Sequence, residues 1–107
     1  MDISVDLGAG GRLELRGVDE DGTVTNADVE LVDGDGRRWA ATVMTHSEIE
    51  RLMETWRSSG ECQSGAFFRV PDLIVVREQD REAVIEVFSE LHRTGGYRDE
   101  MTSLDQE

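Results

Sequence analysis

Lysine is absent from this chain of 107 residues, and cysteine, proline and tyrosine occur once each. All eleven basic residues are therefore arginines, and they stand against 24 acidic residues, so the formal net charge is −13. An electrostatic field of this sign repels nucleic acid and anionic lipid and favours cationic partners. Because Cys62 has no second cysteine to pair with, no internal disulfide can form, which is typical of a reducing compartment.

Long apolar runs are missing as well. No segment approaches the roughly 20 apolar residues of a membrane-spanning helix, and the start of the chain has neither the basic nor the apolar region of a signal peptide. We therefore expect a cytoplasmic protein. Leu, Ile, Val and Phe still make up 26 of the 107 residues, which predicts a folded core.

The first half of the chain alternates apolar and polar residues with the period of two that is typical of half-buried strands. Strands are predicted at residues 3–7, 12–18, 27–31 and 39–43, with turns rich in glycine and aspartate between them. Residues 8–11 lack the spacing of a phosphate-binding loop, and the acidic turns after Asp19 and Asp33 lack the later ligands of an EF-hand. We interpret all of them as turns.

Two helices with the same pattern are predicted in the second half. Thr45 with Glu48 forms a capping box for the first helix, which ends at Gly60. Asp80 caps the second helix, which runs to about Thr94. Each helix carries an apolar stripe with helical spacing. The stripes are Ile49, Leu52, Met53 and Trp56 in the first helix, and Val84, Val87, Phe88 and Leu91 in the second.

The most apolar stretch of the chain, residues 66–76, lies between these helices. Pro71 and Asp72 divide it into two predicted strands, residues 66–70 and 73–76, which we expect to form a hairpin. The second of these strands is apolar at all four positions, as in a strand that is covered on both faces.

This second strand also predicts an interface. If both helices cover one face of the sheet, either Ile74 and Val76 or Leu73 and Val75 are left bare on the other face. Exposed apolar patches of this kind mark interaction surfaces. A homodimer that pairs through the open sheet face is one prediction, and burial of the patch under the C-terminal tail is another.

The element order ββββ-α-ββ-α predicts an α+β fold, with a mainly antiparallel sheet of about six strands and two amphipathic helices packed on one face. Residues 1–96 are predicted to form a single domain, and residues 97–107 a mobile acidic tail. This order resembles that of small acidic secretion chaperones and related bacterial adaptor folds without their N-terminal helix, and small immunity proteins share the same architecture.

Three acidic residues on the second helix are the strongest electrostatic feature. Glu82, Glu86 and Glu90 recur at every fourth position, so they lie on one face, roughly opposite the apolar stripe. A solvated face is one interpretation. The other is a docking strip on which carboxylates pair with an arginine-rich or otherwise basic protein partner.

The residues that could perform chemistry are few. Cys62 could act as a nucleophile only if His46 or His92 were brought beside it, and the neighbouring acidic residues disfavour its thiolate. His46 and Glu50 are spaced as two metal ligands on a helix, but no third ligand lies nearby in the sequence. The sequence therefore predicts neither a metal site nor a cofactor.

Together these features predict a small acidic interaction module that binds a basic protein partner and is not an enzyme. An immunity-type inhibitor of a cationic toxin, or a chaperone or adaptor for one, is the most concrete version. One alternative is a nucleic-acid mimic that inhibits a DNA- or RNA-binding protein. Another is a small hydrolase or transferase that uses Cys62 with a histidine. A small-molecule sensor would need a cavity near Trp39 and Trp56.

Overall fold

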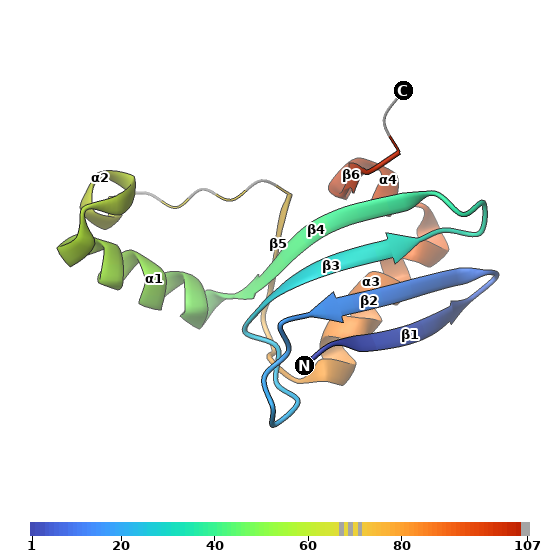
Figure 1. The fold of residues 1–107 in the computed structure, drawn as a ribbon, viewed down its shortest axis with the longest axis horizontal. Helices are drawn as coiled ribbons and strands as arrows, with labels where there is room; N and C mark the ends of the chain where they lie inside the picture. Colours follow the sequence, from blue (N-terminus) through green and yellow to red (C-terminus); the bar gives the residue numbers. More distant parts are fainter. Residues whose placement is uncertain (67, 69, 71, 106–107) are drawn as a thin grey trace.

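A six-stranded sheet organises the computed structural model, which describes residues 1–66, 68, 70 and 72–105 (Figure 1). The four N-terminal strands form an antiparallel meander: β1 (Ile3–Gly8), β2 (Gly11–Arg16), β3 (Asn26–Val32) and β4 (Arg38–Thr45). On one edge of β4, β5 (Leu73–Val76) pairs in parallel and β6 (Thr102–Ser103) pairs antiparallel. The predicted α+β class with a mainly antiparallel sheet of about six strands is confirmed.

The helices begin and end where their capping residues predict. Thr45 Oγ1 accepts a hydrogen bond from the Glu48 amide at 3.2 Å, and Asp80 accepts one from the Ala83 amide at 3.1 Å. Gly60 and Gly95 close the two long helices with φ of 88° and 80°, in the left-handed region that glycine tolerates best. The helical segments are α1 (His46–Ser59), α2 (Glu61–Gly65), α3 (Arg81–Thr94) and α4 (Tyr97–Glu100). Of these, α2 is a left-handed turn and not a regular α-helix, because Cys62, Gln63 and Ser64 have φ of 48° to 61°.

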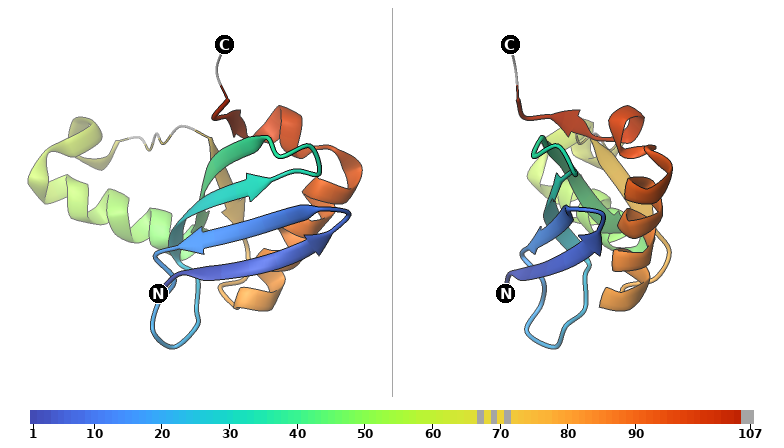
Figure 2. Two further views of the ribbon diagram at one scale, coloured as in Figure 1. Left: turned by 45° about the vertical axis from the view of Figure 1, so that its right-hand side comes forward. Right: turned by 90° about the vertical axis from the view of Figure 1, so that its right-hand side faces the viewer.

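The core lies between α3 and one face of the sheet (Figure 2). Strand register aligns the inward side chains, since Leu13 lies opposite Leu31 in the paired strands β2 and β3. These two leucines are fully buried, as are Val84 and Phe88 from α3. Burying each such side chain contributes about 1.5–3 kcal/mol, so the contact between α3 and the sheet contributes substantially to the stability of the fold.

The opposite face of the sheet is charged. Arg16 forms ion pairs with Glu14 at 2.7 Å and with Glu30 at 3.6 Å, across the outward side of β2 and β3. Alternation along β5 places Val75 on this outward side, where 44% of its surface is exposed. Ile74 and Val76 are on the core side. Of the two residue pairs predicted to be bare, the one that contains Val75 is therefore the exposed one.

The predicted hairpin of residues 66–70 and 73–76 is not the pairing that the structure shows. β5 pairs instead with β4, in a parallel register that places Ile74 opposite Val43. Ala66, Phe68 and Val70 lie in no strand, and the remaining residues of the predicted strand and Pro71 are outside the described residues. Parallel pairing needs a long crossover connection, and the segment from α1 to residue 72 provides it.

The helix α1 does not pack on the sheet face beside α3, as the prediction of two packed helices required. With α2 it forms a projection, residues 46–65, that we call the arm and that extends from the end of β4 (Figure 1). No residue of α1 is buried. No helix in the described ranges is long and apolar enough to cross a membrane.

The C-terminal segment forms part of the core, so the predicted boundary at residue 96 does not coincide with the edge of the core. Tyr97 and Met101 are only 4% and 5% exposed. β6 then pairs with β4, and the Leu104 amide donates to the Arg38 carbonyl at 2.9 Å. These contacts hold the segment against β4, so residues 97–105 are not a tail that stands apart from the fold.

Candidate functional site

A groove runs along the flank of α3 that faces β5. The inward residues of α3, Val84 and Phe88, are committed to the core, whereas Val87 and Leu91 lie at its margin and are half-buried. Ile74 of β5 lies beside them and packs against the same core. The three half-buried side chains therefore give the groove an apolar floor.

Carboxylates from two helices stand at the rim of this floor. Glu86 and Glu90 come from α3, and Glu100 comes from α4; all three line the groove. The groove has a volume of about 550 Å³. Its lining consists of Ile74, Glu86, Val87, Glu90, Leu91 and Glu100.

A second hollow extends the groove toward the N-terminal end of α3. It has a volume of about 340 Å³ and shares Val87 with the first. Val76 and Ala83 continue the apolar floor, and Arg77 and Glu78 lie at its end. The two hollows therefore adjoin at Val87, one after the other along α3.

The rim carboxylates differ in how far they are already neutralised. Glu90 accepts hydrogen bonds from Arg93, through Nε at 3.3 Å and through a guanidinium NH2 group, and these bonds raise the pKa of Arg93. The side chains of Glu86 and Glu100 form no ion pair within the described part of the chain. Two of the three carboxylates are therefore free to meet a cation from outside.

The structure separates the residues of the predicted acidic strip. Glu86 and Glu90 lie at the groove with Ile74. Ile74 was predicted as a possible interface residue on the open sheet face, but it lies on the core side, beside α3. Val76, the second predicted interface residue, is 5% exposed and belongs to the core, although it also lines the extension of the groove. Glu82 lies elsewhere.

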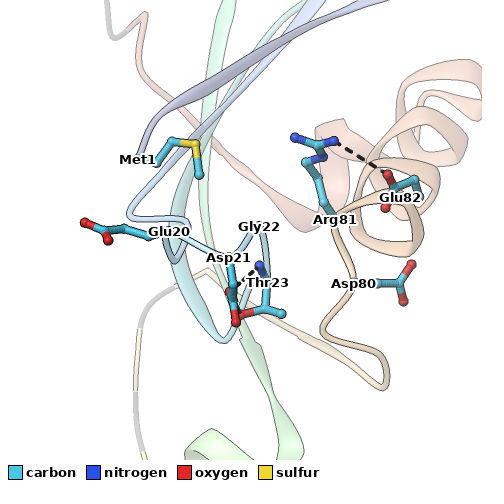
Figure 3. A pocket seen from close by; sticks show the side chains of 8 residues that line it. All are labelled: Met1, Glu20, Asp21, Gly22, Thr23, Asp80, Arg81 and Glu82. Atoms are coloured by element: carbon cyan, nitrogen blue, oxygen red, sulfur yellow. Dashed lines mark hydrogen bonds and ion pairs between the residues drawn. The ribbon is translucent and has the colours of Figure 1, made fainter.

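Glu82 lines a cleft at the N-terminal end of α3, between that helix and the loop after β2 (Figure 3). Its carboxylate forms an ion pair with Arg81 at 3.6 Å. Asp21, across the cleft, accepts hydrogen bonds from the Thr23 hydroxyl and amide at 2.7 and 3.0 Å, and chiefly the hydroxyl bond lowers its pKa. Asp80 caps α3. These polar groups serve the local fold, so we do not assign the cleft a ligand.

Sequence reasoning missed Glu100. The residue lies in the segment that was predicted to be a tail, and no spacing pattern connects it with Glu86 or Glu90. Only the packing of Tyr97 and Met101 into the core brings α4 beside α3. The signal that was available is the pair of apolar residues at 97 and 101, one helical turn apart, which is a pattern of a buried helical face.

One carboxylate is buried away from the groove. Asp33 is 4% exposed and accepts hydrogen bonds from the amides of Asp35 and Arg37, from Trp39 Nε1 and from the Tyr97 hydroxyl, at 2.9 to 3.2 Å. Burial raises the pKa of Asp33, but the four donors together outweigh it and hold the pKa below its ordinary value. This carboxylate ties the β3–β4 turn to α4 and is a structural centre.

The residues considered for catalysis are spread over the molecule. Cys62 is in α2 and His46 begins α1, so most of a 14-residue helix, about 20 Å at 1.5 Å per residue, separates them. His92 stacks on Tyr97 in the rest of the described chain outside the arm, which we call the body, with ring centroids 5.9 Å apart. Trp39 and Trp56 lie in the body and the arm respectively, and do not frame a common cavity. The described residues contain no cluster of His, Cys, Asp and Glu arranged to hold a metal ion.

Comparison with known proteins adds no family to this picture. No protein-family model, no curated protein and no solved structure matches the chain. The groove geometry and the charge of the chain are therefore the basis on which a function can be argued.

Proposed function

We propose that this protein is a cytoplasmic interaction module, without catalytic activity of its own, that binds a basic protein partner in the groove between α3, β5 and α4. An immunity-type inhibitor or a chaperone-like adaptor for a cationic protein fits this description. The observation that carries the proposal is the combination of an apolar floor with three carboxylates at its rim.

The two parts of the groove would contribute differently to binding. Apolar side chains of the partner that cover Ile74, Val87 and Leu91 would add about 25 cal/mol for each Å² of apolar surface removed from water. The net charge of −13 would attract a basic partner over a distance and raise the association rate. Glu86 and Glu100 would then pair with its arginine or lysine side chains at the rim.

A designed peptide that carries the chemistry of the proposed partner tests this proposal. The probe is a synthetic amphipathic peptide of about 18 residues with leucines on one side and arginines on the other, labelled for fluorescence anisotropy. We expect the triple variant Glu86→Gln, Glu90→Gln and Glu100→Gln to bind it at least tenfold more weakly at low salt. Added salt should weaken binding to the native protein more than binding to the variant, because screening removes the attraction.

A matched control separates the groove from the overall charge. Asp2→Asn, Glu20→Gln and Asp28→Asn change the charge by the same amount at exposed positions that lie outside both the groove and the arm. This control should bind the peptide within about twofold of the native protein once the salt concentration is fixed. An equal loss of binding in both triple variants would mean that only the net charge matters and would refute the groove.

A nucleic-acid mimic stays a prediction that the arrangement of the acidic residues does not favour. Such a mimic needs a regular ladder of negative charges. The predicted ladder is interrupted, because Glu82 pairs with Arg81 at a separate cleft and Glu90 pairs with Arg93.

A further inference from the structure

The arm carries an apolar surface that the rest of the molecule does not bury. The stripe of α1 consists of Ile49, Leu52, Met53 and Trp56, and each of these side chains is only half-buried. In both views in which the arm is seen from the side, it extends beyond the sheet and away from α3 (Figures 1 and 2). A 14-residue amphipathic helix of this kind gains most of its stability from packing against a partner.

The contacts within the arm cover only part of this stripe. Trp56 stacks on Phe68, which follows α2 in the chain, with ring centroids 5.3 Å apart and an angle of 13° between the planes. Gly65 packs so closely on the backbone of α1 that a Cβ at this position would lie 2.1 Å from the Met53 carbonyl oxygen. The residues after α1 therefore pack back against its C-terminal half. Phe68 extends the apolar surface next to Trp56.

We propose that this surface is covered by the same surface of a second copy of the chain, with the two α1 helices packed antiparallel about a twofold axis. The charge distribution favours a second copy at this position. Residues 46–65 contain four acidic residues and two arginines, so the arm carries only −2 of the net charge of −13. The remaining residues carry −11, and contact through two projecting arms keeps these larger charges farther apart than contact through the sheet or α3 would.

Ion pairs within α1 neutralise its outer side further. Glu48 accepts two hydrogen bonds from Arg51 at 2.8 Å, and Glu54 lies 3.5 Å from Arg57. The bonds with Arg51 hold the pKa of Glu48 below its ordinary value. Of the three glutamates of α1, only Glu50 forms no ion pair within the described chain, so the stripe has a far smaller unpaired charge beside it than the groove has at its rim and matches an apolar partner better than a strongly basic one.

The flanks of the stripe are complementary in an antiparallel pair. With 3.6 residues per turn, Glu50 and Arg57 lie on the same side of the stripe, two turns apart. A twofold axis that crosses α1 between Met53 and Glu54, midway between positions 50 and 57, reverses the helix direction and places Glu50 of one copy near Arg57 of the other, twice by symmetry. The helix dipoles also oppose each other in this arrangement.

This dimer leaves the proposed groove free, because α3 and α4 lie on the opposite side of β5 from the arm (Figure 1). A dimer would then present two grooves. Two linked sites bind a partner with two basic segments more tightly than one site does, because the second contact becomes intramolecular. The dimer proposal does not depend on what occupies the groove.

Sedimentation equilibrium of the full chain between about 1 and 200 µM tests the proposal. We expect the average mass to rise with concentration from 12.0 kDa toward twice that value. Leu52→Glu should weaken association at least tenfold. Ser58→Glu, which adds the same charge on the opposite side of α1, should associate like the native chain. Circular dichroism confirms that each variant is folded.

A charge exchange tests the antiparallel arrangement itself. Glu50→Arg alone and Arg57→Glu alone should each weaken association, because each places like charges opposite each other. The double variant should restore it. A chain that stays at 12.0 kDa over the whole concentration range, or a dimer that Leu52→Glu leaves unchanged, would overturn the proposal. A dimer that dissociates with Leu52→Glu but shows no rescue would overturn the antiparallel pairing.

Discussion

The two long helices, α1 and α3, are nearly equivalent in sequence and differ completely in their surroundings. Each has 14 residues, a side chain that accepts the N-cap hydrogen bond and a left-handed glycine at its C-terminal end. Each also carries an apolar stripe with the same spacing. Yet α3 buries Val84 and Phe88 in the core, and α1 buries none of its residues. The local sequence determines that each helix forms, but it does not determine which part of the molecule packs against its apolar stripe.

The connections on either side explain the difference. β4 ends at Thr45 and α1 begins at His46, so no loop lets the chain turn back over the sheet. Residues 77–80 separate β5 from α3, and these four residues are enough to reverse the direction of the chain. The body therefore contains the packed helix, and the arm contains the one whose apolar surface stays available.

The largest expected effect compares a core residue of α3 with a stripe residue of α1. Phe88→Ala leaves a cavity in the core and should lower the free energy of unfolding by about 3–5 kcal/mol. Leu52→Ala, at a half-buried position of the arm, should lower it by less than about 1 kcal/mol in dilute protein, because truncating a side chain that is still partly exposed to solvent leaves no enclosed cavity. Urea denaturation measures both. Similar losses would show that the arm and the body unfold as one unit.

The next effect concerns acid. The ordinary pKa of an aspartate is near 3.8, and the folded-state pKa of Asp33 is lower than this. Its contribution to the free energy of unfolding is therefore complete above pH 3.8 and is lost as the pH falls through the folded-state pKa. Asp33→Asn should lower the free energy of unfolding by about 2–3 kcal/mol at pH 7, since it disturbs charged hydrogen bonds. The free energy of unfolding of this variant should also fall less steeply than that of the native protein as the pH drops below 3.8.

A surface carboxylate provides the control for this prediction. The pKa of Asp21 is also lowered, chiefly by its hydrogen bond with the Thr23 hydroxyl, but Asp21 lies in an exposed turn. Asp21→Asn should leave most of the acid dependence in place. If the two variants flatten the pH profile equally, the buried cluster around Asp33 has no special role in the body.

The smallest effect compares the two C-cap glycines. Gly95→Ala and Gly60→Ala both put an alanine in the left-handed region, at a cost of about 1–2 kcal/mol. We expect Gly95→Ala to lower the free energy of global unfolding by that amount, because α3 is part of the core. Gly60→Ala should change global unfolding by less than about 0.5 kcal/mol and should instead speed amide exchange in α1. The opposite order would contradict the division into body and arm.

Part of the candidate site could be predicted from the sequence. Helical periodicity placed Glu86 and Glu90 together on one face of α3. The apolar run at 73–76 drew attention to Ile74, but as a residue of the open sheet face, whereas the structure places it on the core side beside α3. The same periodicity also included Glu82, which the structure places at another cleft. A period of four residues describes one face of a helix, but it contains no information about which neighbouring elements that face meets.

The sequence by itself determined most of the secondary structure, because strand alternation, helix stripes and capping residues act over a few positions. It also determined the net charge and hence the sign of the partner that we propose. Tertiary structure decided that β5 pairs with β4 in parallel, that α4 brings Glu100 to the groove and that α1 leaves the sheet as an arm. These outcomes depend on contacts between residues that are distant in the sequence and on the lengths of the connections between elements, which no local pattern encodes.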